Sequence, residues 1–459
     1  MVRMQSNHIS GSQTLARRLG LFDATMIVMG GIIGTGIFIN PYVVARQVHT
    51  PALILGAWLA GGVIALLGAF VYAELSAELP EAGGQYAYLR EAYHPSVAFI
   101  YGWALLLVIG SGAMAAVAIT FARYFLELTS LPATDQATAL VATLALGGLT
   151  VINCLGVRAG TTLQNVLMLL KIAAIVALVV AGLTINGAAR AGQSGSQVVG
   201  LAAGSNSTFA SLTAFGAAMV PVLFAYGGWQ TACFVAGEVR QPEKNLPRGL
   251  LLGVAGVVVV YLAVNFVCVH VLGAGGLAET TTPASEVMRR ALGERGARFI
   301  ALGITISTLG FLSQSILTEP RVYFAMAADG LFFKSVAQLS RARVPVVAIV
   351  LQGGMAIIVA LSGKYEQILN YVTSVDFIFF GLTATCIFVL RRRARSPASR
   401  RFKVPGHPLT TALFIAACWI IVLNAIYKYP RNTAVGLVIM LAGLPVYFFW
   451  HARRTSKPS

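Results

Sequence analysis

Charged residues are scarce in this sequence. Asp, Glu, Lys and Arg make up 11% of its 459 residues, whereas hydrophobic residues make up 57%. A typical soluble domain has about 25% charged residues, so the composition excludes that class of protein. Apolar runs such as "VLMLLKIAAIVALVVAGL" at 166–183 approach the roughly 20 residues that cross a bilayer as a helix, and they are apolar on nearly all faces, unlike the strands of a membrane barrel. The sequence therefore predicts an all-α polytopic membrane protein.

Cysteine and histidine are also few, with five and six residues. The cysteines show no metal-ligand spacing, and we interpret them as small packing residues. No Ser/His/Asp, Cys/His or phosphate-loop pattern occurs with convincing spacing, and no ATP-binding domain is recognisable. We therefore expect a protein that is not an enzyme, with no cofactor and no metal site.

Acidic residues are fewer than basic ones, 16 against 33, which gives a formal net charge of +17. In a soluble protein this excess would suggest nucleic acid. Here the basic residues lie mainly in short loops between apolar runs, led by "RRRARSPASRRFK" at 391–403, and the expected partner is the lipid bilayer rather than nucleic acid. By the positive-inside rule, both termini are predicted to be cytoplasmic, in the inner membrane of a bacterial cell.

The apolar runs predict twelve transmembrane helices in one domain at 21–451, between cytoplasmic tails at 1–20 and 452–459. The predicted spans are 21–45, 52–77, 96–128, 137–155, 161–185, 212–237, 247–273, 297–326, 344–361, 367–390, 407–427 and 432–451. The predicted organisation is a first repeat at about 21–185, a second at about 212–390, and two further helices at about 407–451.

Two of the predicted spans are interrupted. The first contains "GGIIGTGIFIN" at 30–40, and the sixth contains "VPVLFAYGGWQTACFVAGE" at 220–238. Each glycine costs a helix interior about 1 kcal/mol relative to alanine. Interrupted helices at corresponding positions of two halves are typical of secondary transporters with inverted repeats. The alternative is close helix packing, which the Gly30/Gly34 spacing also fits.

Backbone that is not helical at membrane depth must be buried in protein or line a watery cavity. Amides freed around Thr35 and Gly36 would suit a carboxylate, because they begin the outer half-helix. Carbonyls freed near Ile32, Phe224 and Gly227 would suit an ammonium group. An anion site beside a cation site matches the backbone of an α-amino acid.

Four stretches resemble the amino acid-polyamine-organocation superfamily, and within it the L-type amino acid transporters. They are "GGIIGTGIFINP" at 30–41, "YAELSAELPEAGGQYAYLREAYHP" at 72–95, "FAYGGWQ" at 224–230, and "RVYFAMAADGLFF" at 321–333 with "RVPVVAI" at 343–349. The resemblance implies a leucine-transporter-like fold of 5 + 5 inverted helices plus two more, with helices 1 and 6 broken, that carries L-amino acids.

The resemblance also implies roles for particular residues. It places the substrate carboxylate on Thr35 and Gly36 with Gly34 adjoining, and the amino group on carbonyls of Ile32, Phe224 and Gly227. Phe224 inherits the role of a gate over the substrate. Small residues, among them Ala225, leave space for a substrate side chain, which makes Ala225 a further candidate binding residue. Eukaryotic relatives join a heavy-chain subunit through a cysteine between helices 3 and 4, and "TSLPATD" at 129–135 has none, so no disulfide-linked heavy chain is expected.

Lys171 lies in the middle of the fifth span, where insertion of a lysine costs about 2.5–3.5 kcal/mol. In sodium-independent members of the family, a lysine in this helix occupies the place of a sodium ion between helices 1 and 8, and Lys171 resembles it. We expect Lys171 to bond carbonyls near Gly30 and oxygens near Ser307 or Ser313.

Other intramembrane charges leave the substrate class open. Glu319 and Arg321 are expected to form an interfacial pair around a kink at Pro320, and Asp376 is an acid within the tenth span. Neither broken segment carries an acidic side chain near its break, which favours neutral L-amino acids, moved by sodium-independent exchange or proton-linked uptake. The alternatives are a cationic amino acid transporter with Asp376 or Glu319 as counter-charge, or an amino acid sensor that does not transport.

Overall fold

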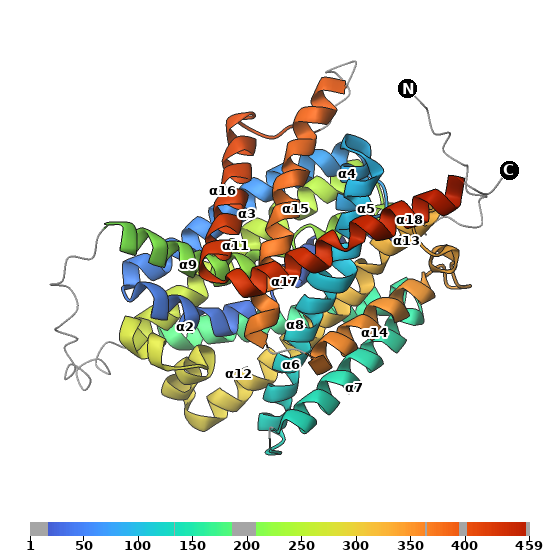
Figure 1. The fold of residues 1–459 in the computed structure, drawn as a ribbon. Coiled ribbons are helices and arrows are strands. Elements are labelled where there is room, and N and C mark those ends of the chain that lie inside the picture. The colour runs from blue at the N-terminus through green and yellow to red at the C-terminus, as the bar shows by residue number, and fades with distance from the viewer. Residues whose placement is uncertain (1–16, 133, 186–207, 363–364, 394–401, 456–459) are drawn as a thin grey trace.

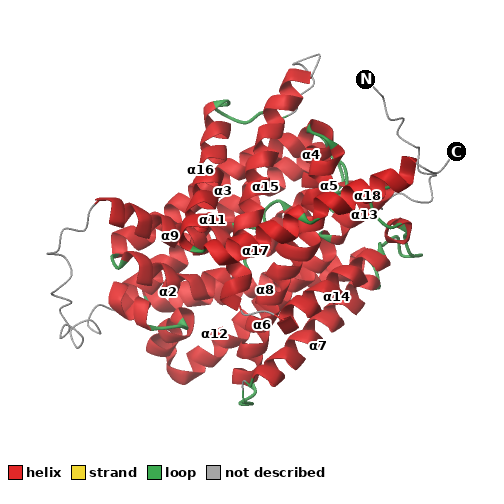
Figure 2. Ribbon diagram, in the orientation of Figure 1, coloured by secondary structure: helices red, strands yellow, loops and turns green. Residues whose placement is uncertain are grey.

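The computed structural model describes residues 17–132, 134–185, 208–362, 365–393 and 402–455. The described part is almost entirely helical, and its only β-pairing is an isolated parallel bridge between Leu19 and Val239 (Figure 2). Much of the two predicted tails and the centre of the basic run, residues 394–401, lie outside the described residues.

The helices follow the predicted spans closely. The first half consists of α1 (Leu21–Ile32), α2 (Gly36–Val48), α3 (Pro51–Glu78), α4 (Gln85–Ala92), α5 (Pro95–Ala104), a π-helical turn (Leu105–Ile109), α6 (Gly110–Leu128), α7 (Asp135–Cys154) and α8 (Val157–Leu183). The second half consists of α9 (Thr208–Tyr226), α10 (Thr231–Phe234), a 3₁₀ turn (Ala236–Glu238), α11 (Pro242–Glu279), α12 (Pro283–Thr318), α13 (Pro320–Ala328), a second 3₁₀ turn (Lys334–Ala337), α14 (Val346–Ser362) and α15 (Tyr365–Arg393). The chain ends with α16 (Leu409–Lys428), α17 (Pro430–Leu441) and α18 (Gly443–Thr455).

Within the described residues, eleven helical segments are long and apolar enough to cross a membrane. The remaining predicted span, 344–361, forms the apolar helix α14 of 17 residues. At 1.5 Å per residue it is about 26 Å long, slightly less than the roughly 30 Å hydrocarbon core. The prediction of an all-helical polytopic membrane protein is confirmed.

The two halves pack on each other in a reciprocal way, and Figure 1 shows two of these contacts, α3 beside α11 and α2 beside α9. The first helix of the first half, α1, packs on α11, the second long helix of the second half. In turn α9 packs on α3, and α2 lies against α9. Such exchange of equivalent contacts is the packing expected of two repeats related by inversion.

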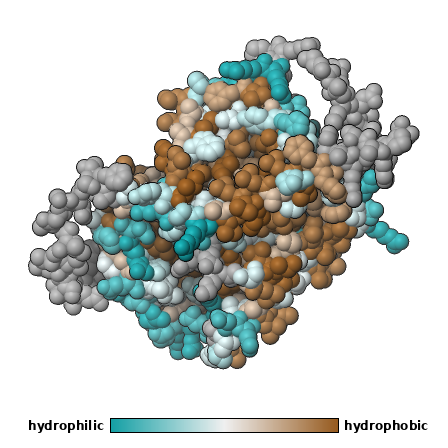
Figure 3. All heavy atoms as spheres, in the orientation of Figure 1, coloured by the Kyte–Doolittle hydropathy of each residue, from teal (hydrophilic) through white to brown (hydrophobic). Residues whose placement is uncertain are grey.

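The outer surface is apolar where lipid would lie. Large apolar side chains are exposed on several of the helices. More than 60% of the residue surface is exposed at Leu144 on α7, Leu423 on α16 and Val438 on α17. Figure 3 shows apolar side chains spread across the middle of one face and polar ones gathered toward opposite edges. A contiguous apolar surface of this kind is a liability in water but suits a bilayer.

Candidate functional site

The first span is broken between α1 and α2, as the glycines predicted. The backbone leaves the helix at Ile33, and α2 begins at Gly36. The first amides of a helix have no partner within it, so those at the start of α2 are free to bind an anion. The Thr35 hydroxyl beside them is buried, 1% exposed, and has no hydrogen-bond partner among the described residues.

The sixth span is broken between α9 and α10. Residues 227–230 form a turn, and Gly228 has a φ of +103°, which favours glycine. A Cβ added at Gly228 would lie 2.1 Å from the carbonyl oxygen of Gly31, and one added at Gly36 would lie 2.7 Å from Cβ of Ala225. The two breaks therefore touch through their backbones. The glycines therefore fit both predicted roles, because they interrupt the helices and permit close packing at the same place.

A tyrosine hydroxyl connects the two breaks. The hydroxyl of Tyr261, on α11, lies 3.0 Å from the carbonyl oxygen of Ile32 and 3.1 Å from that of Ala225. A hydroxyl has one proton, so it donates to one of these carbonyls at a time. The sequence reasoning missed this residue. The one available signal was a lone polar group in the run "VVVVYLAV" at 257–264.

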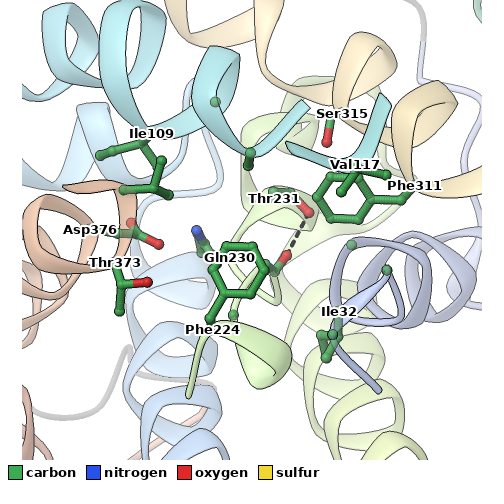
Figure 4. Close-up of a pocket in the computed structure, with 18 of the residues that line it drawn as sticks. Ile32, Ile109, Val117, Phe224, Gln230, Thr231, Phe311, Ser315, Thr373 and Asp376 are labelled. Atoms are coloured by element: carbon green, nitrogen blue, oxygen red, sulfur yellow. Dashed lines mark hydrogen bonds between the residues drawn. The ribbon is translucent and has the colours of Figure 1, made fainter. Parts of the chain in front are cut away.

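The breaks line one pocket with an empty volume of about 750 Å³, which includes space open to solvent. All seven predicted substrate residues line it, namely Ile32, Gly34, Thr35, Gly36, Phe224, Ala225 and Gly227. The half-buried rings of Phe224 and Phe311 also line it, and Phe311 packs against Gly34 (Figure 4). Phe311 was not predicted. Whether these residues bind a substrate, and whether Phe224 gates it, stays a prediction.

Hydrogen bonds from α12 hold the second break. Gln314 donates from Nε2 to the Thr231 hydroxyl at 2.6 Å, and Thr231 donates to the Gly228 carbonyl at 2.7 Å (Figure 4 shows the second bond). Asn40, on α2, donates to the Pro221 carbonyl at 2.7 Å. The helix that contains the second break is thus held both from its own half, by α12, and from the first half, by α2.

Lys171 lies outside the pocket lining and directly behind the first break. Its side chain is completely buried, and Nζ donates a hydrogen bond to the carbonyl oxygen of Ile33. A Cβ added at Gly310, on α12, would lie 3.6 Å from Nζ, so the ammonium group lies between α1 and α12. The predicted partners differ in detail. The carbonyl is that of Ile33 rather than one near Gly30, and the hydroxyls of Ser307 and Ser313 make no hydrogen bond in the described structure.

The expected pair of Glu319 and Arg321 is wrong. Arg321 is completely buried and donates from Nε to Glu238 at 2.7 Å, while Glu319 accepts a hydrogen bond from Gln352 at 2.8 Å and lines the pocket with Asp376. The reason is helical geometry: side chains two positions apart point in different directions. The two charges therefore meet different neighbours.

Comparison with known proteins agrees with this architecture. Residues 19–450 match the family described as "Amino acid permease". The chain is 30% identical over 448 residues to the serine/threonine exchanger SteT of Bacillus subtilis, a match that covers 96% of this chain and 98% of that protein. It is 27% identical over 447 residues to the human cystine/glutamate transporter, covering 95% and 85% of the two chains, and 27% identical over 462 residues to the human b(0,+)-type amino acid transporter 1, covering 97% and 91%. The chain therefore belongs to the amino acid permease family, within the amino acid-polyamine-organocation superfamily of membrane transporters.

Proposed function

We propose that this chain exchanges L-amino acids across the membrane without sodium, by alternating access. The observation that carries the proposal is the pocket at which the two breaks meet, because the residues at the start of α2 and the residues of both breaks line the same space. An α-amino acid carries an anion and a cation on one carbon. Few other small molecules would require backbone amides and backbone carbonyls so close together.

Within this site, the amides at the start of α2 hold the carboxylate, with Gly34, Thr35 and Gly36 nearest to it. The unpartnered Thr35 hydroxyl adds a donor on the same side. Carbonyls of Ile32, Phe224 and Gly227 accept from the amino group. The Ile32 carbonyl accepts from the Gly34 amide at 2.9 Å, so its second lone pair is open to the substrate when the Tyr261 hydroxyl donates to the Ala225 carbonyl instead.

Lys171 takes the place of a coupling ion. A sodium ion between α1 and α12 would need oxygen ligands from both helices and would tie their positions to the sodium gradient. The Lys171 amino group, bonded to Ile33 and packed against Gly310, occupies that position instead. A side chain that stays in place of the ion supports transport that is independent of sodium. The name of the Bacillus subtilis relative, a serine/threonine exchanger, supports exchange over net uptake.

Counterflow into proteoliposomes tests this function. Vesicles containing the purified chain are loaded with one unlabelled L-amino acid and diluted into a panel of radiolabelled ones, with potassium or sodium outside. We expect uptake that requires internal amino acid and is equal in the two salts. Uptake from empty vesicles driven only by a pH gradient would indicate proton-linked transport, and binding without any uptake would indicate a sensor.

We further propose that the chain works in the inner membrane of a bacterial cell, with both termini in the cytoplasm and without a disulfide-linked subunit. The positive-inside pattern supports the orientation. The segment 129–135 contains no cysteine, which supports the second point. A fluorescent protein that matures only in the cytoplasm can be fused after Ser459, and we expect cells with this fusion to be fluorescent. Cells that contain the intact fusion but are not fluorescent would show that the C-terminus lies outside the cytoplasm.

A further inference from the structure

Two carboxyl groups line the same pocket as the breaks. Glu319 lies at the junction of α12 and α13, and Asp376 lies on α15. No Lys, Arg or His is among the described residues that line the pocket. The nearest basic residue in the sequence, Arg321, is bound to Glu238, and Lys171 is bound to Ile33 behind the first break. The described lining of the pocket therefore contains two acidic side chains and no basic side chain to pair with them.

The Glu319 carboxyl is held by a hydrogen bond from α14 and fits against a glycine of α6. Its Oε2 accepts from Gln352, on α14, at 2.8 Å. A Cβ added at Gly110 would lie 2.1 Å from the same oxygen, so only glycine leaves room for the carboxyl there. Gly110 directly follows the π-helical turn at Leu105–Ile109. Such turns are rare and often mark functional sites, and this one, together with Gly110, makes space for the carboxyl beside the pocket.

Further polar side chains lie near Asp376. Thr373 and Asp376 are three residues apart on one helix and share a face, and Figure 4 shows both at the side of the pocket away from Ile32. The side chain of Gln230, from the second break, lies beside Phe224, and its amide nitrogen faces Asp376 (Figure 4). Gln230 is 4% exposed, and its Oε1 has no hydrogen-bond partner in the described structure, nor has Oδ1 of Asp376.

Buried acceptors without donors point to a ligand that brings donors. We propose that Asp376, Glu319 and Gln230 form a second subsite, which takes the ammonium or guanidinium group of a cationic amino acid side chain. This inference rests on the proposed function, since the α-amino and α-carboxyl groups stay at the breaks. The rings of Phe224 and Phe377 line the same pocket and suit the apolar stem of such a side chain. The substrate class is thus the cationic alternative that the sequence left open.

Matched pairs of substrates test the subsite. Uptake of radiolabelled L-lysine, L-arginine, L-norleucine and L-citrulline is measured in proteoliposomes, because norleucine lacks the lysine charge and citrulline lacks the arginine charge at nearly the same shape. We expect kcat/KM to be at least about tenfold higher for each cationic member of a pair. Asp376→Asn and Glu319→Gln should each remove most of this preference while norleucine uptake continues, which also shows that the variants fold. Glu294→Gln, at an exposed carboxyl on α12, is the control and should keep the preference.

Equal or weaker uptake of the cationic member by the unmodified protein overturns the proposal, even if no variant folds. Full preference in both folded variants overturns it as well. If the neutral amino acids enter and the cationic ones do not, only this subsite is wrong and the proposed function stands. If none of the four amino acids enters while another L-amino acid of the counterflow panel is exchanged, only the subsite is wrong. If no L-amino acid is exchanged, the proposed function fails and the subsite fails with it.

Discussion

Lys171 is a completely buried cation that contacts the backbone of one helix and the glycine surface of another. Its replacement by alanine removes both the charge and the hydrogen bond to Ile33. We expect Lys171→Ala to reduce amino acid exchange at least about tenfold, because a hydrogen bond to a charged group is worth about 1.5–3 kcal/mol. Exchange in proteoliposomes measures the effect, and an unchanged melting temperature would show that the variant folds. Exchange by this variant at the rate of the unmodified protein would show that Lys171 has no role in transport.

Tyr261 offers a milder test at the same scale. Tyr261→Phe keeps the ring and removes the hydroxyl shared by the Ile32 and Ala225 carbonyls. A hydrogen bond of this kind contributes about 0.5–1.5 kcal/mol, so substrate affinity should fall by about two- to tenfold. The control is Tyr88→Phe, on α4, which removes a buried hydroxyl that has no hydrogen-bond partner in the described structure and does not line the pocket. Equal dissociation constants for the two variants would contradict the linking role.

At the scale of elements, the contact between the two breaks depends on Gly228. Gly228→Ala would place a methyl group 2.1 Å from the Gly31 carbonyl and would also force alanine into a φ of +103°. The left-handed conformation alone costs about 1–2 kcal/mol, and the overlap adds to it, so we expect a lower melting temperature and little exchange. Gly354→Ala, where a Cβ meets nothing within 4 Å, is the matched control. A Gly228→Ala variant as stable and active as this control would mean that the breaks do not touch.

The ion pair between Glu238 and Arg321 ties the 3₁₀ turn after α10 to α13. Both side chains are almost completely buried, at 1% and 0% exposure. Glu238→Gln leaves the guanidinium buried without its counter-charge, which typically costs about 3–5 kcal/mol. We therefore expect a clear drop in melting temperature in detergent.

The comparison for this variant is Glu294→Gln, which breaks an exposed pair with Arg289 worth about 0–1 kcal/mol. A similar melting temperature for the two variants would show that the buried pair contributes no more than a surface pair does.

Some elements could be predicted from sequence and others could not, for physical reasons. The breaks at Gly34 and at Gly227–Gly228 were predictable because glycine weakens a helix wherever it stands. The π-helical turn at Leu105–Ile109 was not, because "LLLVI" contains no helix breaker. The partner of Arg321 was not predictable either, since Glu238 is 83 residues away and follows α10, which reaches this region by packing against α12.

On the scale of the whole molecule, the length and polarity of the apolar runs were enough to place the helical spans along the sequence, because the thickness of a bilayer sets the length of a spanning helix. Of the twelve predicted spans, eleven are long and apolar enough within the described residues to cross a membrane. The position of Lys171 behind the first break followed from a resemblance rather than from composition. The sequence offered Asp376 or Glu319 as counter-charge only as an open alternative, because the two residues come from helices that become neighbours only in the folded protein. Sequence reasoning therefore described the backbone half of the site better than the side-chain half.

The reciprocal packing of the two halves makes the meeting point of the breaks the natural place for a substrate, since both halves contact it. An experimental structure of the protein with a bound L-amino acid tests this claim most directly. The account predicts the α-carboxylate at the amides of Thr35 and Gly36, with Gly34 adjoining, and the α-amino group within hydrogen-bond distance of the Ile32, Phe224 and Gly227 carbonyls. An amino acid bound elsewhere, or bound in this pocket with its α-carboxylate turned away from the start of α2, would contradict it.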